Sequence, residues 1–301
     1  MELRHLRYFV AVADAGHMTR AAAQLGIQQP PLSLQIKALE QRLGMALFQR
    51  HPKGMQLTDG GRTFLPEARR LLTEMSALEL RMQRVARGEQ GRLAVAFTSS
   101  AAAHAFTPQA LRACRARYPE ITLELSEANA AEITDGVAQA RLHCGLLRVP
   151  VSRPDGVALE HLLDEPAVLA LPLDHRLAGS RGAVALGELR HESLVLVRRP
   201  GAPGLYANLL ALCEAAGFQP RIVAEVDRMM TNLNLVAAGA GVSVVPASMQ
   251  GMHAHAVVYR PLAARLDAPL TLAYRSADCA GPTASFVALL RGLAKPARRR
   301  A

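Results

Sequence analysis

The apolar residues of the first ninety positions recur with the spacing of helices rather than of strands. A stripe at steps of four, three and four residues follows the helical period: Leu32, Ile36, Leu39 and Leu43. A shorter apolar face precedes it and is interrupted by Gly26. Pro30 and Pro31 fall in the first turn of the second helix, where a missing N–H group costs little. The pattern predicts two helices joined by a tight turn, with Gln28 or Gln29 as the cap.

The face of the second helix that this stripe leaves free is polar and basic. It carries Gln29, Ser33, Leu34 and Lys37. Hydrogen-bonding and cationic side chains on one helix face suit base edges and phosphates in the major groove of DNA. We interpret the two helices as a helix-turn-helix, and the alternative is an ordinary helical hairpin with a solvated polar face.

The flanking segments predict the other parts of a winged DNA-binding domain. Residues 48–57 (FQRHPKGMQL) indicate two short strands, a hairpin that presents Arg50, His51 and Lys53 to a phosphate backbone or a minor groove. An upstream apolar stripe predicts a supporting first helix that stops at Gly16: Leu3, Leu6, Phe9, Val10 and Ala13. These additions favour the helix-turn-helix over a plain hairpin.

Three blocks of this region resemble a known family: MELRHLRYFVAVADAG, TRAAAQLGIQQPPLSLQIKALEQRLGMALFQR and LTDGG. They are similar to the DNA-binding domain of LysR-type transcriptional regulators, nearly without gaps from Met1 to about Leu72. The chain departs from the family's usual S-R-Q-I run, because Leu34 stands where an arginine is expected to contact DNA. The helix face, the wing and the resemblance together predict the DNA-binding residues Arg20, Gln28, Gln29, Pro30, Ser33, Leu34, Lys37, Arg50 and Lys53.

A long helix is expected from Thr58, whose hydroxyl can cap it, to about Arg87. Its apolar residues alternate steps of four and three, the seam of a coiled coil: Phe64, Ala68, Leu71, Met75, Leu78, Met82 and Val85. The alternative is packing against its own domain, but no neighbouring segment has a matching free apolar face, so we favour a homodimer. The resemblance implies the same dimer. Two-fold symmetry then predicts an operator with an inverted repeat.

After residues 88–91 (GEQG), which have the composition of a hinge, strand-like and helix-like segments alternate. The first series is expected at residues 93–97, 107–118, 121–127, 131–140 and 143–147, and the second at residues 167–171, 194–197, 205–216, 221–226, 229–238 and 242–245. The order βαβαβ predicts a mostly parallel sheet with helices on both faces. A strand at 269–274 and a helix at 283–293 follow the second series in the chain, and we assign them to the first α/β unit, as the resemblance also implies.

The expected fold class is thus an α/β effector-binding region of two Rossmann-like lobes, periplasmic-binding-protein-like, preceded by an all-α winged helix-turn-helix domain and a linker helix. The expected boundaries are 1–58 for the DNA-binding domain, 59–87 for the linker or dimerisation helix, 88–91 for the hinge, 92–164 and 266–293 for lobe I, 165–265 for lobe II and 294–301 for a basic tail.

Two α/β lobes joined by two crossovers leave a cleft, and ligands bind beyond the carboxyl ends of the strands in such sheets. Thr98, Ser99 and Ser100 follow the first strand and precede a helix, so their hydroxyls and N–H groups can converge on an anion. Arg148 follows another strand and can add a fork for a carboxylate. The corresponding turn of the second lobe carries Pro203, Gly204, Leu205 and Tyr206. The alternative is that the serines only cap a helix and Arg148 is a solvated charge.

Five further stretches resemble the LysR subgroup that controls the breakdown of aromatic compounds: MELRHLRYFVAVA, FTSS, GLLRVP, DEPAVLALPLDHRLA and LNLVAAGAGVSVVPAS. The resemblance implies that Ser100, Arg148 and the turn from Gly204 to Tyr206 line an effector pocket. Ala130 stands where some relatives place a ligand-binding hydroxyl, so the effector need not be the same.

Composition narrows the function further. The formal net charge of +10 favours polyanionic partners. Four cysteines lie far apart in the sequence without C-x-x-C spacing, so we expect reduced thiols. No apolar segment has the length of a signal sequence or of a membrane-spanning helix. No G-x-S-x-G, H-E-x-x-H or P-loop pattern occurs, so we expect no enzyme and no cofactor. His253 and His255 lack a third ligand, so we expect no metal site.

We therefore expect a cytoplasmic activator or repressor of transcription. Its expected partners are double-stranded promoter DNA with an inverted repeat, a small organic acid, aromatic or another carboxylate, a second copy of the chain in a homodimer or homotetramer, and RNA polymerase; no membrane is expected. The rival class is a periplasmic-type solute-binding protein, or a small-molecule-binding enzyme, with an appended helical domain.

Overall fold

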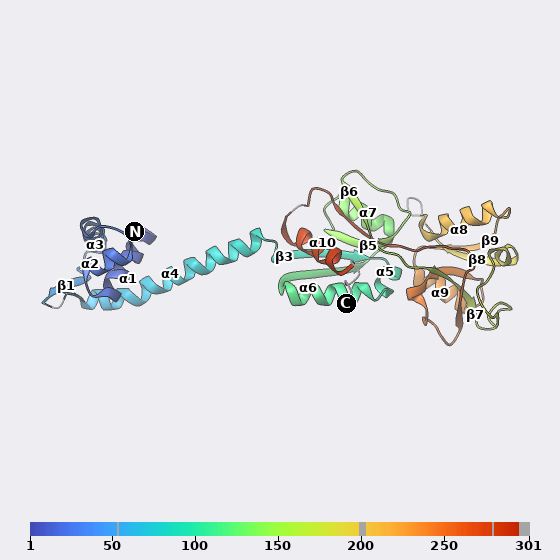
Figure 1. Cartoon of the computed structure of the whole chain (residues 1–301), viewed down its shortest axis with the longest axis horizontal. Helices are drawn as coiled ribbons and strands as arrows, with labels where there is room; N and C mark the ends of the chain where they lie inside the picture. Colours follow the sequence, from blue (N-terminus) through green and yellow to red (C-terminus); the bar gives the residue numbers. More distant parts are fainter. Residues whose placement is uncertain (53, 199–202, 279, 295–301) are drawn as a thin grey trace, which may run out of the picture. The chain divides into compact units, whose positions relative to one another are not determined.

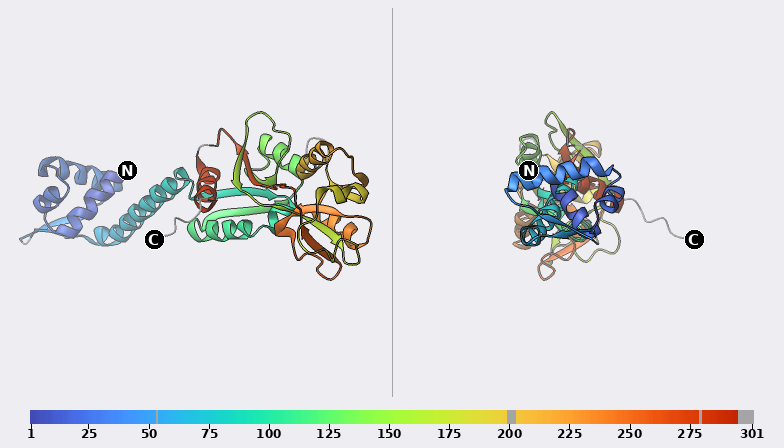
Figure 2. Two further views of the ribbon diagram at one scale, coloured as in Figure 1. Left: turned by 45° about the vertical axis from the view of Figure 1, so that its right-hand side comes forward. Right: turned by 90° about the vertical axis from the view of Figure 1, so that its left-hand side faces the viewer.

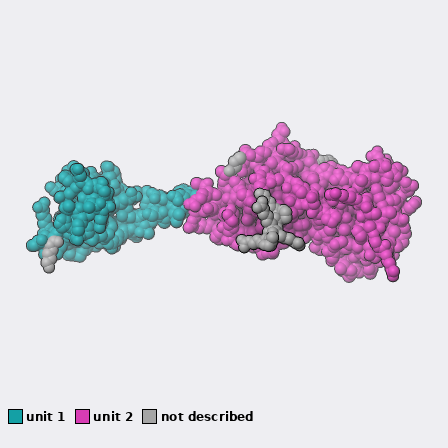
Figure 3. Space-filling view, in the orientation of Figure 1, with its two compact units in different colours: residues 1–83 teal, residues 84–301 magenta. Residues whose placement is uncertain are grey.

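The computed structural model describes residues 1–52, 54–198, 203–278 and 280–294. The chain forms two compact units, residues 1–83 and 84–301 (Figure 3). None of the helices in the described residues is long and apolar enough to cross a membrane. Lys53 and Cys279 lie outside the described residues, as does the expected basic tail except for Ala294, which ends the last helix.

The first unit begins with three helices: α1 (Leu3–Ala15), α2 (Met18–Gln24) and α3 (Gln29–Leu43). Glycines in the left-handed conformation end α1 and α3, Gly16 at φ 60° and Gly44 at φ 68°, as such helix ends require. Gln28 is the N-cap of α3, with the two prolines in its first turn. The predicted stripes Leu6–Phe9 and Leu32–Ile36–Leu39 are buried in one core. The helix-turn-helix prediction is confirmed.

The wing is an antiparallel hairpin of β1 (Phe48–His51) and β2 (Gly54–Leu57). It leads into α4 (Asp59–Ala86), the longest helix of the described chain (Figure 1). The Thr58 hydroxyl accepts a hydrogen bond of 3.0 Å from the Gly61 N–H, as the predicted cap requires. The all-α description of this domain was therefore incomplete, because the wing adds a small sheet.

The seam predicted along α4 divides into two parts. Ala68 is buried in the core of the first unit, Leu71 packs against that core, and the rings of Phe64 and Phe9 lie 5.0 Å apart. Ala68 is buried within its own domain, which contradicts its assignment to a dimer seam. Phe64 and Leu71 pack against the same core but are only partly buried, so their place in a seam stays a prediction. The first half of α4 packs on an apolar surface that was not predicted, and this surface is formed jointly by α1 and the wing. Leu78, Met82 and Val85 remain 44%, 51% and 44% exposed.

In the second unit, the first sheet has the strand order β4-β3-β5-β12-β6. Its strands are β3 (Gln90–Phe97), β4 (Glu120–Glu127), β5 (Cys144–Arg148), β6 (Val157–Leu163) and β12 (Leu270–Arg275). Its helices are α5 (Ser99–Ala103), α6 (Phe106–Arg117), α7 (Ala130–Ala138) and α10 (Gly281–Ala294). The core between the sheet and α5, α6 and α10 is separate from the core under α7, so helices cover both faces (Figure 2).

The second lobe holds β7 (Ala167–Pro172) between β10 (Ser243–Pro246) and β11 (Val257–Pro261), and a parallel pair of β8 (Ser193–Val197) and β9 (Arg221–Val226). Its α-helices are α8 (Gly204–Ala215) and α9 (Met229–Ala237), which pack over separate cores. Two short 3-10 helices are η1 (Leu186–His191) and η2 (Ala247–Met249).

The prediction of a mostly parallel sheet is wrong. The β3–β4 and β3–β5 pairs are parallel, but β12 is antiparallel to both β5 and β6, and β7 is antiparallel to β10 and β11. The strands β6 and β11 were not predicted. The chain returns from the second lobe to the first, and β12 enters the first sheet in the opposite sense to β5, which makes this five-stranded sheet mixed, whereas the β10-β7-β11 sheet is antiparallel.

Residues 88–91 do not form the free hinge that their composition indicated. Gln90 and Gly91 pair with Glu120 and Ile121 in the β3–β4 ladder. A Cβ atom on Gly88 would lie 2.2 Å from the carbonyl oxygen of Gly281, so only glycine fits there. The strand therefore begins three residues earlier than predicted, because the β4 backbone satisfies its hydrogen-bonding groups.

Two crossovers join the lobes and are paired with each other. The Ala167 N–H donates to the Leu266 carbonyl at 2.8 Å, and the Ala268 N–H donates to the Glu165 carbonyl at 2.7 Å. The connections run through residues 163–167 and 266–270, beside the carboxyl ends of β5 and β10. A change in the angle between the lobes therefore requires a change in the backbone of these two segments.

Candidate functional sites

The first unit has a groove of about 450 Å³ between α3, the start of α2 and the wing. Gln29, Ser33 and Lys37 of α3 line it, together with Arg50 of β1. His17 and Thr19, at the start of α2, also line the groove and were missed by the sequence reasoning. These two residues could have been predicted from their position at the start of the first helix of the helix-turn-helix. The groove thus collects hydrogen-bonding and cationic groups on one side of α3.

Four other predicted DNA-binding residues lie outside this groove: Arg20, Gln28, Pro30 and Leu34. Arg20 donates a hydrogen bond of 2.7 Å to the Ala15 carbonyl, which ties its guanidinium to the end of α1. Leu34 is 66% exposed, so the family's arginine position carries a solvent-facing apolar side chain here. Lys53 lies outside the described residues.

The second unit has a pocket between its two lobes, with about 70 Å³ of interior volume. The predicted residues that line it are Thr98, Ser99, Ser100, Arg148, Gly204, Leu205 and Tyr206. Pro203 does not line the pocket; it is the exposed N-cap residue of α8. The sequence reasoning missed Asn129, Val197, Arg198, Asp227, Met229 and Pro246, and gave Ala130 only as a departure. The missed residues also lie at the ends of strands or at the starts of helices, and this position could have been used to predict them.

The hydroxyls of the first lobe are already engaged in local hydrogen bonds. The Thr98 hydroxyl accepts from the Ala101 N–H at 3.3 Å and lies 3.3 Å from the Ser100 hydroxyl. The Ser99 hydroxyl accepts from the Met229 N–H at 3.3 Å, and this bond spans the two lobes. Thr98, rather than one of the serines, is therefore the N-cap residue of α5, which does not prevent the same edge from receiving a ligand.

Tyr206 lies beneath the pocket and is almost completely buried. Its hydroxyl lies 2.7 Å from the Ser243 hydroxyl and accepts from the Asn232 amide at 3.3 Å. Burial raises the pKa of Tyr206, while these two hydrogen bonds lower it less. The phenol therefore stays neutral and links α8 to α9.

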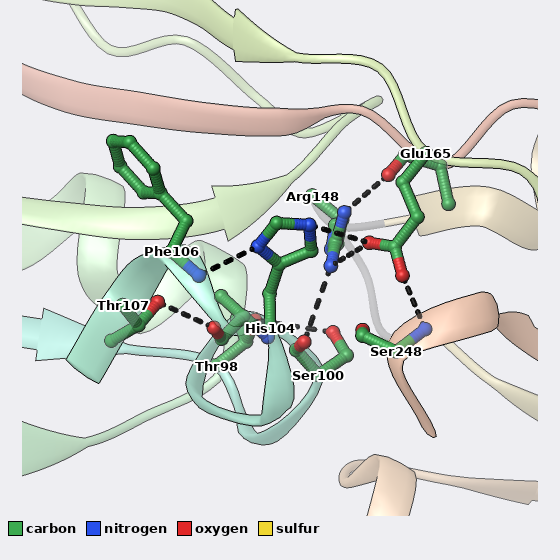
Figure 4. A network of polar contacts seen from close by, with 10 residues as sticks. Thr98, Ser100, His104, Phe106, Thr107, Arg148, Glu165 and Ser248 are labelled. Atoms are coloured by element: carbon green, nitrogen blue, oxygen red, sulfur yellow. Dashed lines mark hydrogen bonds and ion pairs between the residues drawn. The ribbon is translucent and has the colours of Figure 1, made fainter. Parts of the chain in front are cut away.

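Arg148 is only 6% exposed and is held on several sides (Figure 4). One terminal nitrogen lies 2.5 Å from a carboxylate oxygen of Glu165 and donates to the Ser100 carbonyl at 3.2 Å. The other donates to the carbonyl of Ala268 on the second crossover. Burial lowers the pKa of Arg148, and the charge of Glu165 opposes that shift. Arg148 is thus not a solvated charge, so that alternative was wrong. It lines the pocket, and its contact with an effector carboxylate stays a prediction, since its terminal nitrogens are engaged within the protein.

Glu165 connects this arginine to both lobes. It lies on the first crossover, is 5% exposed, and accepts a hydrogen bond from the Ser248 N–H in the second lobe. His104 of the first lobe lies 3.9 Å from the same carboxylate oxygen that pairs with Arg148. Burial lowers the pKa of His104, and the charge of Arg148 adds to the decrease while that of Glu165 opposes it. A polar network therefore runs from the pocket wall through the crossovers.

The described residues hold no group of three potential metal ligands. His253 and His255 lie in the turn before β11 rather than on a strand, with ring centroids 6.0 Å apart. The described cysteines Cys114, Cys144 and Cys213 are buried and unpaired. These groups suggest no further chemistry at either site.

A helix-turn-helix with a polar groove, joined to two α/β lobes around a pocket, defines a ligand-responsive DNA-binding regulator. Residues 3–62 match the family model described as bacterial regulatory helix-turn-helix protein, lysR family, and residues 86–294 match the LysR substrate binding domain. The chain belongs to the LysR family of transcriptional regulators, and the rival classes of solute-binding protein and enzyme are not supported.

Relatives match over most of their length. The chain is 37% identical to the HTH-type transcriptional regulator AlsR of Bacillus subtilis, over 91% of this chain and 90% of AlsR. It is 37% identical to the HTH-type transcriptional regulator TfdS of Cupriavidus pinatubonensis, over 99% of this chain and 98% of TfdS. The structure of CbnR, a LysR family transcriptional regulator, matches with a TM-score of 0.81 at 32% identity, over 97% of this chain and 100% of CbnR.

Proposed function

We propose that this LysR-type regulator binds an inverted-repeat promoter site as a homodimer or homotetramer and responds to a small organic acid held between its lobes. The acid belongs to the aromatic acids or related carboxylates that the sequence resemblance implies. RNA polymerase is the partner through which the regulator acts on transcription.

The main observation in support of an anionic ligand is that two helices begin at the pocket. Gly204 and Leu205 at the start of α8 line it, and so does Met229 at the start of α9. The Gly204 N–H already donates to the Pro150 carbonyl at 3.0 Å and the Met229 N–H to the Ser99 hydroxyl at 3.3 Å. The N-cap residues Pro203 and Arg228 make no side-chain cap hydrogen bond, and the dipoles of the two helices favour a negative charge at their starts. The Ser99 and Ser100 hydroxyls add donors from the first lobe. This arrangement supports an anionic group such as a carboxylate.

The DNA-binding role rests on the groove beside α3. Ser33 and Gln29 supply groups for base edges, while Arg50 supplies a cation for the backbone. A CbnR structure in complex with its target DNA matches this chain with a TM-score of 0.77 at 32% identity, over 98% of this chain and 100% of that CbnR chain. We propose that this chain contacts promoter DNA through the same domain.

The test is a gel-shift and footprinting assay with full-length protein and the promoter of a neighbouring operon, with and without organic acids. We expect protection of an inverted repeat and a change in the footprint when the acid binds. Sedimentation in the same buffer gives the oligomeric state. Protection of a single half-site by a monomer, or a footprint that no organic acid alters, would contradict the proposal.

A further inference from the structure

The most exposed large apolar side chain among the described residues lies on the helix that carries the proposed base contacts. Leu34 of α3 is 66% exposed. A single exposed leucine is common on protein surfaces and needs no explanation by itself. What Leu34 can contact is decided by the direction in which α3 presents it.

Leu34 points away from the core of the first unit. Leu32 and Ile36, two residues before it and two residues after it, are buried in that core. A step of two residues turns about 200° around an α-helix, so Leu34 lies on the opposite side of α3. Exposed residues that share this side are Pro30, Lys37, Ala38 and Gln41. Leu34 therefore forms the outermost part of the helix in its second turn.

Hydrogen-bonding and cationic groups border this apolar position. Ser33, the preceding residue, and Lys37, three residues later, line the groove of the first unit together with Arg50 of the wing. Positive groups around an apolar contact match duplex DNA, in which phosphates border the edges of the bases. An apolar protein surface over Leu34 would instead remove water from Lys37, which is unfavourable for a charge. The surroundings of Leu34 thus fit DNA better than an apolar protein partner.

A leucine side chain in the major groove has one favourable contact among the base edges. Residues near the start of a recognition helix reach these edges, and thymine presents a 5-methyl group there. The other bases present mainly donors and acceptors, which Leu34 would leave without partners. We propose that Leu34 is a specificity-determining residue that packs on a thymine 5-methyl group in each half-site of the operator. This inference rests on the proposed DNA-binding function.

The first test uses the wild-type protein. The full-length chain selects an operator from a pool of random duplexes, and each thymine of that operator is then replaced by deoxyuridine, which removes only the 5-methyl group. We expect one thymine in each half-site at which this replacement weakens binding about fourfold, the change that corresponds to one buried carbon of about 0.8 kcal/mol. Replacement in both half-sites should weaken binding roughly fifteenfold. Fluorescence anisotropy measures the affinities.

Leu34→Ala tests whether this side chain makes the methyl contact. In this variant, deoxyuridine at the same thymine should leave the affinity unchanged, and a new selection should lose the preference for thymine at that position alone. The slope of log K against log salt should equal that of the wild type, because Leu34 carries no charge for a phosphate. Since Leu34 is exposed, the variant should fold normally, and thermal unfolding checks this.

Leu80→Ala is the matched control. Leu80 is also an exposed leucine on a helix of the first unit, at 47%, but it lies on α4. This variant should lose as much affinity as the wild type when the thymine methyl group is removed. Sedimentation of Leu34→Ala should give the oligomeric state of the wild type.

Equal wild-type affinity for thymine and deoxyuridine at every position would overturn the inference while leaving the DNA-binding role standing. A methyl effect that persists in Leu34→Ala would overturn it as well, because another residue would then make the contact. A weaker oligomer in Leu34→Ala would show that Leu34 faces a protein partner instead. Failure of the wild-type protein to select any duplex would overturn both the inference and the proposed DNA-binding function.

Discussion

At the scale of single residues, the ion pair between Arg148 and Glu165 has the largest consequences for stability. Both side chains are nearly inaccessible, and they come from β5 and the first crossover. The pair fastens the pocket wall to both connections between the lobes through the Ala268 carbonyl and the Ser248 N–H. Loss of one partner should therefore affect folding before it affects ligand binding.

We predict that Arg148→Ala lowers the free energy of unfolding by about 3–5 kcal/mol, because Glu165 is left buried without its countercharge. Urea unfolding of the full chain, followed in the second unit, measures the effect. Arg92→Ala is the control, since Arg92 is 75% exposed in its pair with Glu124 and should cost about 0–1 kcal/mol. Equal losses in the two variants would mean that the buried pair has no special role.

The lowered pKa of His104 predicts a pH dependence. Burial is the main cause, and the unfolded chain has the ordinary histidine value of about 6.5. Because the folded pKa is the lower one, stability is greatest above pH of about 6.5 and is lost as the pH falls through the folded pKa. His104→Gln should reduce the decrease in melting temperature between pH 7.5 and 5.

His143 also has a lowered pKa, so the decrease in His104→Gln should be smaller rather than absent. His161→Gln is the control, because the His161 side chain is 54% exposed in its contact with Asp164. A melting profile of His104→Gln identical to that of the wild type would exclude His104 as a cause.

At the scale of elements, α3 and the wing divide the DNA contacts. We predict that Ser33→Ala weakens operator binding more than binding to unrelated DNA, because it removes a group aimed at base edges. Arg50→Ala should weaken binding to both DNAs and reduce the slope of log K against log salt by about one. Fluorescence anisotropy at several salt concentrations measures both effects, and reversed behaviour of the variants would refute this division.

The exposed part of α4 makes a separate prediction about assembly. Leu78→Glu or Met82→Glu should raise the dimer dissociation constant by at least roughly a hundredfold, since each substitution occurs in both subunits and burial of each such side chain contributes about 1.5–3 kcal/mol. Leu80→Glu is the matched control, because Leu80 is 47% exposed but lies off the predicted seam. Sedimentation velocity distinguishes them, and an unchanged dimer in both seam variants would place the interface elsewhere.

At the scale of the whole molecule, the second unit begins before its first strand. Arg84 pairs with Glu120, and Gly88 packs against Gly281. We predict that a fragment of residues 84–294 folds and binds the effector as tightly as the full chain. A fragment of residues 92–294 lacks two pairs of the β3–β4 ladder and should melt at least about 2–4 °C lower, the shift expected for about 1 kcal/mol in a unit of this size. Equal melting temperatures would show that residues 84–91 contribute nothing.

The local elements, and the edge of the sheet at which the pocket forms, could be predicted from the sequence. Helical periodicity placed Leu32, Ile36 and Leu39 in a core, as the structure has them. Gly16 was predicted to end the first helix, and it adopts there the left-handed conformation that glycine favours. The rule that ligands bind beyond strand ends located Ser99, Ser100 and Arg148 around one pocket. These signals are local, since they depend on residues a few positions apart.

The pairing of distant segments could not be predicted from the sequence and is known from the folded chain. Nothing in the spacing of the sequence indicated that β12 would enter between β5 and β6, or that Glu165 and the Ala268 carbonyl would occupy Arg148. Likewise, the sequence did not indicate that the first half of α4 packs against α1, where the rings of Phe64 and Phe9 are in contact. Strand order and the partner of a buried charge depend on which segments meet in space, and a one-dimensional pattern carries no signal for such contacts.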